Sequence, residues 1–158
     1  DLKEFAQTPV IVVSAGAKAI LDLPKTLEVL ETFGVPVYGF QTDLFPAFYS
    51  AESDLHIDRI DSEKEIADIY KTNIKLGFKN GILVANPIPK KNEIPFEEMD
   101  EHIKIALERA KRNNVTGREL TPFLLAEIVK ITKGSSLETN IKLVENNVAV
   151  ACRIAKAF

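Results

Sequence analysis

The stretch that most constrains the fold is residues 9–22, where a short apolar run leads into a glycine and then a lysine. The run Val10–Val13 contains four β-branched residues and no alternating polar one, which is the pattern of a strand buried on both faces of a parallel sheet. Lys18 is the first charged residue after this run, where a helical pattern begins. In open α/β sheets ligands bind outside the carboxyl ends of the strands. Position alone leaves two interpretations of Lys18 open: a reactive amine at the sheet edge, or a solvated lysine in the first turn of a helix.

Length and composition predict one ordinary globular domain. The chain has 158 residues, of which 46% are hydrophobic, and a net charge of −3, so one domain over residues 1–158 can bury a sizeable core. Acidic and basic residues are interspersed, which argues against a nucleic-acid or anionic membrane partner. No apolar segment approaches the roughly 20 residues that cross a bilayer. The single cysteine, Cys152, cannot form an internal disulfide, and this is typical of a reducing compartment. We therefore expect a cytoplasmic protein.

Hydrophobic periodicity predicts alternating strands and helices after the first strand. Ser62 and Glu65 have the spacing of a capping box, which marks the start of one helix. The expected strands are 35–40, 56–60 and 81–86, and the expected helices are 17–23, 24–33, 62–77, 96–113, 121–134 and a last one that begins at 135 and includes Cys152. This order predicts a layered α/β/α fold with a mostly parallel central sheet and a helical C-terminal part.

The last predicted helix contains both apolar residues and amides. The residues expected to face inward are Leu137, Ile141, Val144, Val148, Ala151 and Cys152. Asn146 and Asn147 are expected on a solvated face, because an unpaired buried amide costs about 1–3 kcal/mol. Asn140 lies near the helix start and is a candidate ligand contact.

The segment Phe45–Tyr49 is aromatic, is interrupted by Pro46, and has neither helical nor strand periodicity. Three interpretations remain open for it: a lid or binding loop, a surface that packs on a neighbouring subunit, or plain core packing of Phe45 and Phe48.

Several classes of chemistry lose support because their motifs do not occur. The sequence has no GxxxxGK[ST] phosphate loop, no GxGxxG and no paired Cys or Cys–His metal spacing. Ser14 lacks the preceding glycine of a GxSxG hydrolase motif. Lysine chemistry remains, since burial at the end of an apolar strand disfavours the ammonium form and favours the neutral, nucleophilic amine. Lys18 has this setting.

Six blocks, in this order along the chain, resemble the pseudouridine-5′-phosphate glycosidase family, which is also called the indigoidine synthase A family. The blocks are VVSAGAKAILD at 12–22, LEVLETFGVPV at 27–37, FPAFY at 45–49, VANPIP at 84–89, TPFLL at 121–125 and NIKLVENN at 140–147. The resemblance covers essentially the whole chain.

The resemblance implies a homotrimeric α/β enzyme that uses a divalent metal, usually Mn²⁺. Such an enzyme reversibly cleaves the C–C glycosidic bond of pseudouridine 5′-phosphate and gives uracil and ribose 5-phosphate. The family's nucleophile is the lysine of the GAK motif, which is Lys18 here. By the family pattern its amine attacks C1 of the ring-opened ribose phosphate, and uracil leaves from the covalent imine-type adduct.

The resemblance also implies two substrate-binding residues. Asp1 and Leu2 match the last two letters of a Ser-Ala-Asp-Leu segment that contacts substrate in the family. Asn140 matches the asparagine that the family places near the uracil. The family's metal-binding aspartate, catalytic glutamate and phosphate-side lysine belong to the sequence before this match, so no metal ligand is assigned here. We therefore expect this chain to be the C-terminal half of a longer enzyme.

Two other functions fit the residues without the resemblance. One is another lysine-dependent sugar-phosphate lyase of the aldolase type, with Lys18 as the Schiff-base residue. The other is a non-catalytic binding module that docks a partner through Phe45–Tyr49.

Overall fold

The computed structural model describes residues 1–18 and 20–158, and its centre is a four-stranded parallel sheet. The sheet has the order β1-β4-β2-β3, with strands β1 (Ile11–Ser14), β2 (Val37–Phe40), β3 (Asp58–Ile60) and β4 (Ile82–Ala85). The helices are α1 (Leu2–Phe5), α2 (Leu23–Thr32), α3 (Glu63–Lys75), α4 (Phe96–Arg112), α5 (Leu120–Ile131) and α6 (Ser135–Lys156), with short 3₁₀ turns η1 (Lys90–Asn92) and η2 (Gly117–Glu119). The predicted layered α/β/α fold is confirmed.

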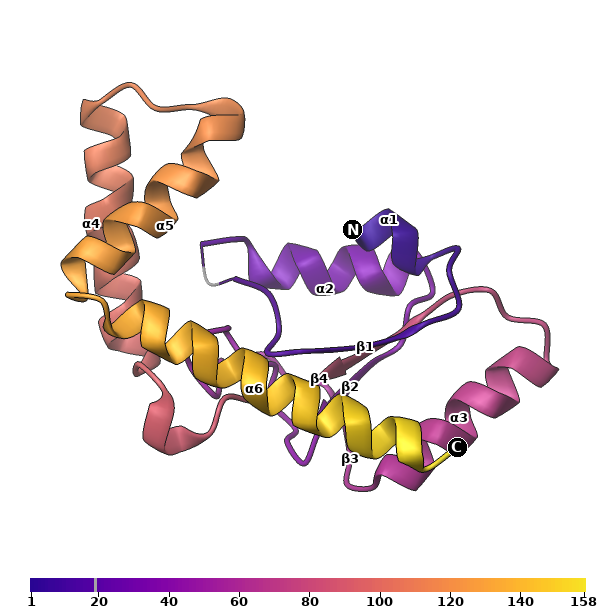
Figure 1. The fold of residues 1–158 in the computed structure, drawn as a ribbon. Helices are drawn as coiled ribbons and strands as arrows, with labels where there is room; N and C mark the ends of the chain where they lie inside the picture. Colours follow the sequence, from indigo (N-terminus) through magenta and orange to yellow (C-terminus); the bar gives the residue numbers. More distant parts are fainter. Residues whose placement is uncertain (19) are drawn as a thin grey trace.

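Strand alternation divides the core into two layers. Leu83 and Ala85 of β4 join the cluster that contains Leu30 of α2, whereas Ile82 and Val84 join Ile66 of α3 and Val150 of α6. Successive strand residues point to opposite faces of a sheet, so one four-residue strand supplies both layers. Figure 1 shows the result, with α2 on one side of the sheet and α3 and α6 on the other.

Helices α2 and α3 each begin after a residue whose side chain caps the helix. Asp22 accepts a hydrogen bond from the Lys25 backbone N–H at 3.1 Å, and Pro24 occupies the first turn of α2. Ser62 likewise accepts from the Glu65 N–H at 3.1 Å and caps α3. The predicted helix at 17–23 was wrong: residues 17, 18 and 20–22 are not helical, because α2 starts only after its Asp22 cap. Residue 19, which that prediction included, lies outside the described residues.

The first strand does not have the burial that its sequence predicts. Its four residues are half-buried and Val10 is 40% exposed, whereas all four residues of β4 are buried. The reason is that β1 lies at the edge of the sheet and pairs with β4 alone, while β4 lies between β1 and β2. The apolar run predicted a strand correctly, but its burial on both faces was wrong.

Helices α4 and α5 form a hairpin that stands away from the sheet (Figure 1). Its core is apolar and contains Met99, Ile103, Ala106, Ala110, Leu124 and Ile128, with Tyr49 and Ile94 joining it from the loops. Glu127 lies within the hairpin with its side chain 9% exposed, and accepts hydrogen bonds from Lys130 at 2.6 Å and Arg109 at 2.7 Å. These two partners lower the pKa of Glu127, Lys130 having the larger effect.

The last helix is rotated relative to the sequence prediction. Leu137, Ile141 and Val148 are 52%, 52% and 56% exposed, and Val144 and Cys152 are also exposed. The residues that α6 buries are Ser136, Thr139, Leu143, Val150 and Ile154. The predicted inward face was therefore wrong. Both sets of residues have helical spacing, so periodicity does not tell which of them faces the sheet. None of the described helices is both long and apolar enough to cross a bilayer.

Candidate active site

Lys18 lies in the loop that leaves β1 at the carboxyl edge of the sheet. Ser14, the last residue of β1, pairs with Ala85 of β4, and Lys18 follows four residues later. The backbone turns there, since the Leu21 N–H donates to the Lys18 carbonyl at 2.8 Å. Lys18 is half-buried and is not in the first turn of a helix. The edge placement is thus the one expected for a ligand-binding residue in a parallel sheet.

A second loop packs directly against the start of the Lys18 loop. Gly16 and Ala47 form an antiparallel bridge, and the Phe48 N–H donates to the Ala15 carbonyl at 2.9 Å. Gly16 has a φ of 76°, and a Cβ atom there would lie 1.8 Å from the Pro46 carbonyl oxygen. Only glycine satisfies both conditions, so the sequence of the Lys18 loop is matched to the path of residues 45–49.

The end of β4, beside the end of β1, is closed by amides from α6. Asn86 is 4% exposed; its N–H donates to the Ser14 carbonyl at 2.7 Å, and its side-chain Nδ2 donates to Asn147 Oδ1 at 2.9 Å. Asn146 Nδ2 donates to the Pro87 carbonyl at 2.9 Å. The prediction that Asn146 and Asn147 lie on a solvated face was wrong. The sequence signal for these contacts was the occurrence of two amides in a helix that packs on the sheet, because a buried amide needs a hydrogen-bond partner.

Asn140 is half-buried and lies on the same face of α6 as Asn147. Seven residues separate the two, which is about two helical turns or roughly 10 Å along the axis. Leu143, one turn after Asn140, packs with Ala15 and Ile88 beyond the ends of β1 and β4. The same helix face therefore brings Asn140 to the edge of the sheet where Lys18 lies.

Asp1 has a different setting. It is exposed, and as the N-cap of α1 it makes no side-chain hydrogen bond to that helix. Phe5, at the other end of α1, accepts a hydrogen bond from the Gly81 N–H at 2.6 Å, just before β4 begins. The described contacts thus bring Lys18 and Asn140 to the carboxyl edge of the sheet and tie the helix that follows Asp1 to the amino edge. The substrate-binding roles of Asp1 and Asn140 stay predictions.

Ion pairing distinguishes Lys18 from Lys90, which follows the end of β4. Lys90 donates to Glu52 at 2.8 Å, and this hydrogen bond, with the attraction of the Glu52 charge, raises the pKa of Lys90. Both residues line a polar hollow of about 510 Å³ next to residues 50–54. Across residues 1–18 and 20–158, no carboxylate forms an ion pair with the Lys18 amine. The Glu52 carboxylate therefore favours the ammonium form of Lys90.

A metal site is not formed by the part of the chain that the structure describes. Within it, no group of three or more His, Cys, Asp or Glu side chains is placed to hold a metal ion. The residues present therefore do not fit the expected divalent cation.

Comparison with known proteins decides the family. A family model described as "Indigoidine synthase A like protein" matches residues 1–157. The chain belongs to this family. Among curated family relatives, the pseudouridine-5′-phosphate glycosidases of Petrotoga mobilis and Mesorhizobium japonicum are each 54% identical over 159 aligned residues, which cover 100% of this chain and 52% of each relative. The chain thus spans about half the length of the curated relatives it matches.

Two solved structures share the fold. The crystal structure of the prealnumycin C-glycosynthase AlnA in complex with ribulose 5-phosphate aligns with a TM-score of 0.94 at 30% identity, over 99% of this chain and 52% of that one. An indigoidine synthase A (IdgA)-like protein from Thermotoga maritima aligns with a TM-score of 0.87 at 39% identity, over 98% of this chain and 51% of that one. Both extend over about twice the length described here.

Proposed function

We propose that this chain carries the nucleophilic lysine of a pseudouridine-5′-phosphate glycosidase, which reversibly cleaves the substrate's C–C glycosidic bond to uracil and ribose 5-phosphate. The observation that carries the proposal is the position of Lys18, half-buried at the carboxyl edge of a parallel sheet and without an ion-pair partner among the described residues. Support comes from relatives with this name at 54% identity over the full chain. A neighbour named as a C-glycosynthase, in complex with ribulose 5-phosphate, supports the same bond type and a sugar phosphate ligand.

The Lys18 amine acts as a nucleophile toward the sugar. In the proposed cleavage, the bond between C1 and the ring oxygen of the ribose breaks and that oxygen takes up a proton, while Lys18 Nζ bonds to C1 of the ring-opened sugar and gives up a proton. The electrons of the bond between C1 and the uracil carbon leave with uracil, which takes up a proton at that carbon. The nitrogen lone pair then completes an imine between Nζ and C1. Water hydrolyses the imine, which releases ribose 5-phosphate as the aldehyde and restores the amine.

Asn140 and Asp1 bind the substrate in this proposal. The side-chain amide of Asn140 offers donors and acceptors together, which matches the alternating carbonyl and N–H groups of uracil. Its place on the same helix face as Asn147 supports a location near Lys18. The role of Asp1 rests on the resemblance to the family, since the contacts of α1 place that helix at the amino edge of the sheet and not beside Lys18. Its carboxylate makes no capping hydrogen bond and can accept one from a substrate hydroxyl.

Three further properties of the whole enzyme are part of the proposal. The divalent metal, Mn²⁺, takes its ligands from residues other than those described, and no step above depends on it. The homotrimer is supported by the exposed apolar side chains of α6, because such patches mark surfaces that bind protein. A cytoplasmic location is supported by the free, exposed thiol of Cys152.

The test is to trap the imine. The protein as its host produces it is incubated with ribose 5-phosphate and borohydride, and its peptides are analysed by mass spectrometry. We expect one reduced adduct, on the peptide that contains Lys18, and none in Lys18→Arg. A Lys25→Arg variant, which changes an exposed lysine paired with Asp22, should keep the adduct. Modification elsewhere, or none, would contradict the role of Lys18. Cleavage within the sugar carbon chain, without uracil release from pseudouridine 5′-phosphate, would favour an aldolase-type lyase.

A further inference from the structure

Phe48 has a backbone conformation that a bulky residue seldom adopts. Its φ is 67°, in the left-handed region, where the Cβ of an L-residue crowds the following carbonyl oxygen. Strained residues of this kind persist only where the surrounding structure holds them, and they concentrate at functional sites. The contacts of Phe48 therefore indicate what the strain maintains.

The backbone of Phe48 holds the beginning of the Lys18 loop. Its N–H donates to the Ala15 carbonyl at 2.9 Å, next to the bridge between Gly16 and Ala47. Gly16 has no room for a Cβ atom against the Pro46 carbonyl. The chain from Ser14 toward Lys18 is thus confined on the side of residues 46–48.

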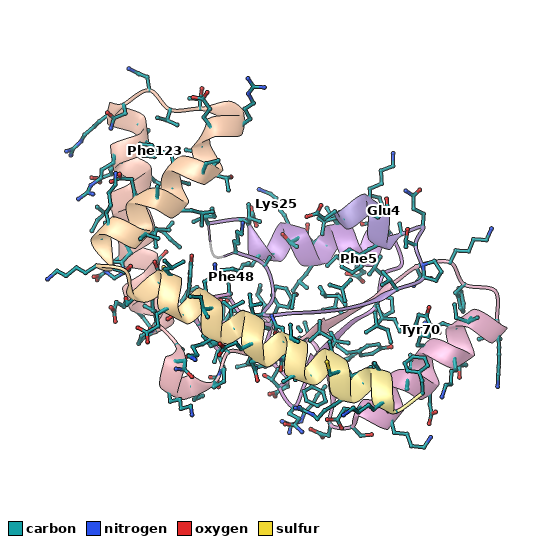
Figure 2. All side chains as sticks on the ribbon, viewed as in Figure 1. Glu4, Phe5, Lys25, Phe48, Tyr70 and Phe123 are labelled. Carbon is teal, nitrogen blue, oxygen red and sulfur yellow. The ribbon has the colours of Figure 1, made fainter. Side chains whose placement is uncertain are left out.

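The side chain of Phe48 packs on two clusters near the Lys18 loop. One contains Ala15 and Leu143, and the other is the hairpin cluster, against which Ile20 packs as well. It meets the Tyr49 ring edge-on, with centroids 4.9 Å apart. Figure 2 shows Phe48 beside the loop that joins β1 to α2, between that loop and α6. Phe48 therefore connects Ala15, before Lys18, with α6, and it shares the hairpin cluster as a packing surface with Ile20, after Lys18.

The neighbours of Phe48 argue against a mobile lid. Phe45 is 0% exposed and Tyr49 is 4% exposed, so the segment is anchored in the core on both sides of Phe48. Ser50 strengthens the anchor by donating to the Ile94 carbonyl at 2.7 Å. Phe48 itself is only half-buried. Core packing thus explains the burial of Phe45 and Tyr49, but it does not explain the strained backbone of Phe48.

We propose that Phe48 is a positioning residue that holds the Lys18 loop, and with it the Lys18 amine, in the geometry for attack on the sugar. The catalytic part of this inference rests on the proposed function. A nucleophile must come within about 3–3.5 Å of its target, and a misplacement of about 1 Å can cost about 100-fold in rate. Residues 17, 18 and 20–22 are not helical, so this part of the chain depends on tertiary contacts for its shape.

The test compares two truncations of the same kind of side chain. Phe48→Ala removes the ring that links the Lys18 loop to the two clusters. Phe123→Ala is the matched control, because Phe123 is also half-buried against the hairpin cluster but belongs to α5 (Figure 2). In the protein as its host produces it, we expect the rate of borohydride-trapped adduct formation to fall about 10- to 100-fold in Phe48→Ala and to stay within about twofold in Phe123→Ala. Both variants should lower the melting temperature.

A second measurement does not depend on the reaction. Amide hydrogen exchange of the peptide that covers residues 14–22 should become faster in Phe48→Ala and remain unchanged in Phe123→Ala. Unchanged exchange in Phe48→Ala, or an equal change in both variants, would overturn the proposal. Another outcome is that exchange responds as expected while the wild-type protein forms no Lys18 adduct. In that case Phe48 holds the loop, but the proposed function is wrong, and so is the claim that Phe48 positions an attacking amine. If the adduct forms and its rate is the same in Phe48→Ala, the positioning role alone is wrong.

Discussion

Strands β1 and β4 are neighbours in the sheet, have equal length and are both apolar, yet they end in different ways. Strand β4 lies in the centre, is buried throughout and ends at Asn86, whose amide is 4% exposed and bonded to Asn147. Strand β1 lies at the edge, is half-buried and continues through Gly16 to Lys18. The central strand closes its end with paired amides, while the edge strand carries the amine. In this sheet, position in the strand order separates the end that is closed by amides from the end for which we propose the chemistry.

The physical reason lies in access and in hydrogen bonding. A buried polar group must be paired, so Asn86 at the covered end of β4 is engaged by protein atoms and is not available to a ligand. Lys18 leaves the edge strand in a half-buried loop and can meet a substrate. Four experiments test this contrast, in order of decreasing expected effect.

The largest effect, on activity, is expected for a substitution of Lys18, after the end of β1. Lys18→Arg keeps a positive charge but removes the primary amine that forms an imine. We expect loss of uracil release from pseudouridine 5′-phosphate by about 10³-fold or more, since a nucleophile has no substitute. The melting temperature should change little, because Lys18 forms no ion pair among the described residues. Steady-state assays and thermal melts measure the two properties. Full activity in Lys18→Arg would place the chemistry elsewhere.

The next largest effect, on the free energy of unfolding, is expected for a pair of residues at matching positions in β1 and β4. Ile11 and Ile82 are partners in the register, but Ile82 is 0% exposed and Ile11 is half-buried. Ile82→Ala should lower the free energy of unfolding by about 2–5 kcal/mol, the usual cost of a buried cavity, and Ile11→Ala by about 1 kcal/mol. Denaturant titration of both variants measures the difference. Equal losses would mean that β1 is as buried in the native protein as β4.

A smaller effect separates two asparagines at the same edge. Asn86→Ala leaves Asn147 without its partner, so we expect a loss of about 1–3 kcal/mol of stability. Asn140→Ala should change stability by less than about 0.5 kcal/mol, and should instead raise the KM for uracil in the synthetic direction by about tenfold, as expected for a lost ligand hydrogen bond. Thermal melts and initial rates with varied uracil separate the two roles. A KM for uracil that does not change in Asn140→Ala would remove Asn140 from the binding site.

The smallest effect is expected in the α4–α5 hairpin, which belongs to neither strand. Lys130 and Arg109 lower the pKa of Glu127 in the folded state, so the ionised carboxylate stabilises the fold above the unfolded pKa of about 4.3. This contribution is lost as the pH falls through the lower folded pKa. The melting temperature of Glu127→Gln should therefore be lower than that of the wild type at pH 6, and the difference between the two melting temperatures should become smaller toward pH 3. A difference that does not change with pH would show that the carboxylate charge is not the stabilising feature.

Much of the local structure follows from local chemistry. The Ser62 cap, Pro24 in a first turn and the run Ile82–Ala85 act over a few residues, so the sequence predicts the helices and strands that they begin or form. The position of Lys18 after β1 was predicted in the same way. The six ordered blocks predicted the family, because a match of this length does not depend on any single element being assigned correctly.

The sequence predictions that were wrong concern how elements pack against one another. Leu137, Ile141, Val144 and Val148 have the spacing of a buried face, yet α6 packs through Leu143, Val150 and Ile154. Residues 17–23 have helical periodicity, yet residues 17, 18 and 20–22 are not helical, because the chain at Gly16 pairs with residues 45–49 and α2 starts only after its Asp22 cap. The left-handed Phe48 has no signal in the sequence, since an aromatic residue is not the type that adopts this conformation by itself.

The sequence by itself therefore determined the α/β class, the family and the place of Lys18 after the first strand, because these depend on short-range patterns and on residue identity. The tertiary structure alone decided that β1 is an edge strand, that amides of α6 close the end of β4, and that the Phe48 N–H bonds to Ala15 before Lys18. Strand order, helix rotation and loop contacts depend on which surfaces meet in space. Those contacts join residues that lie tens of positions apart, and no local pattern encodes them.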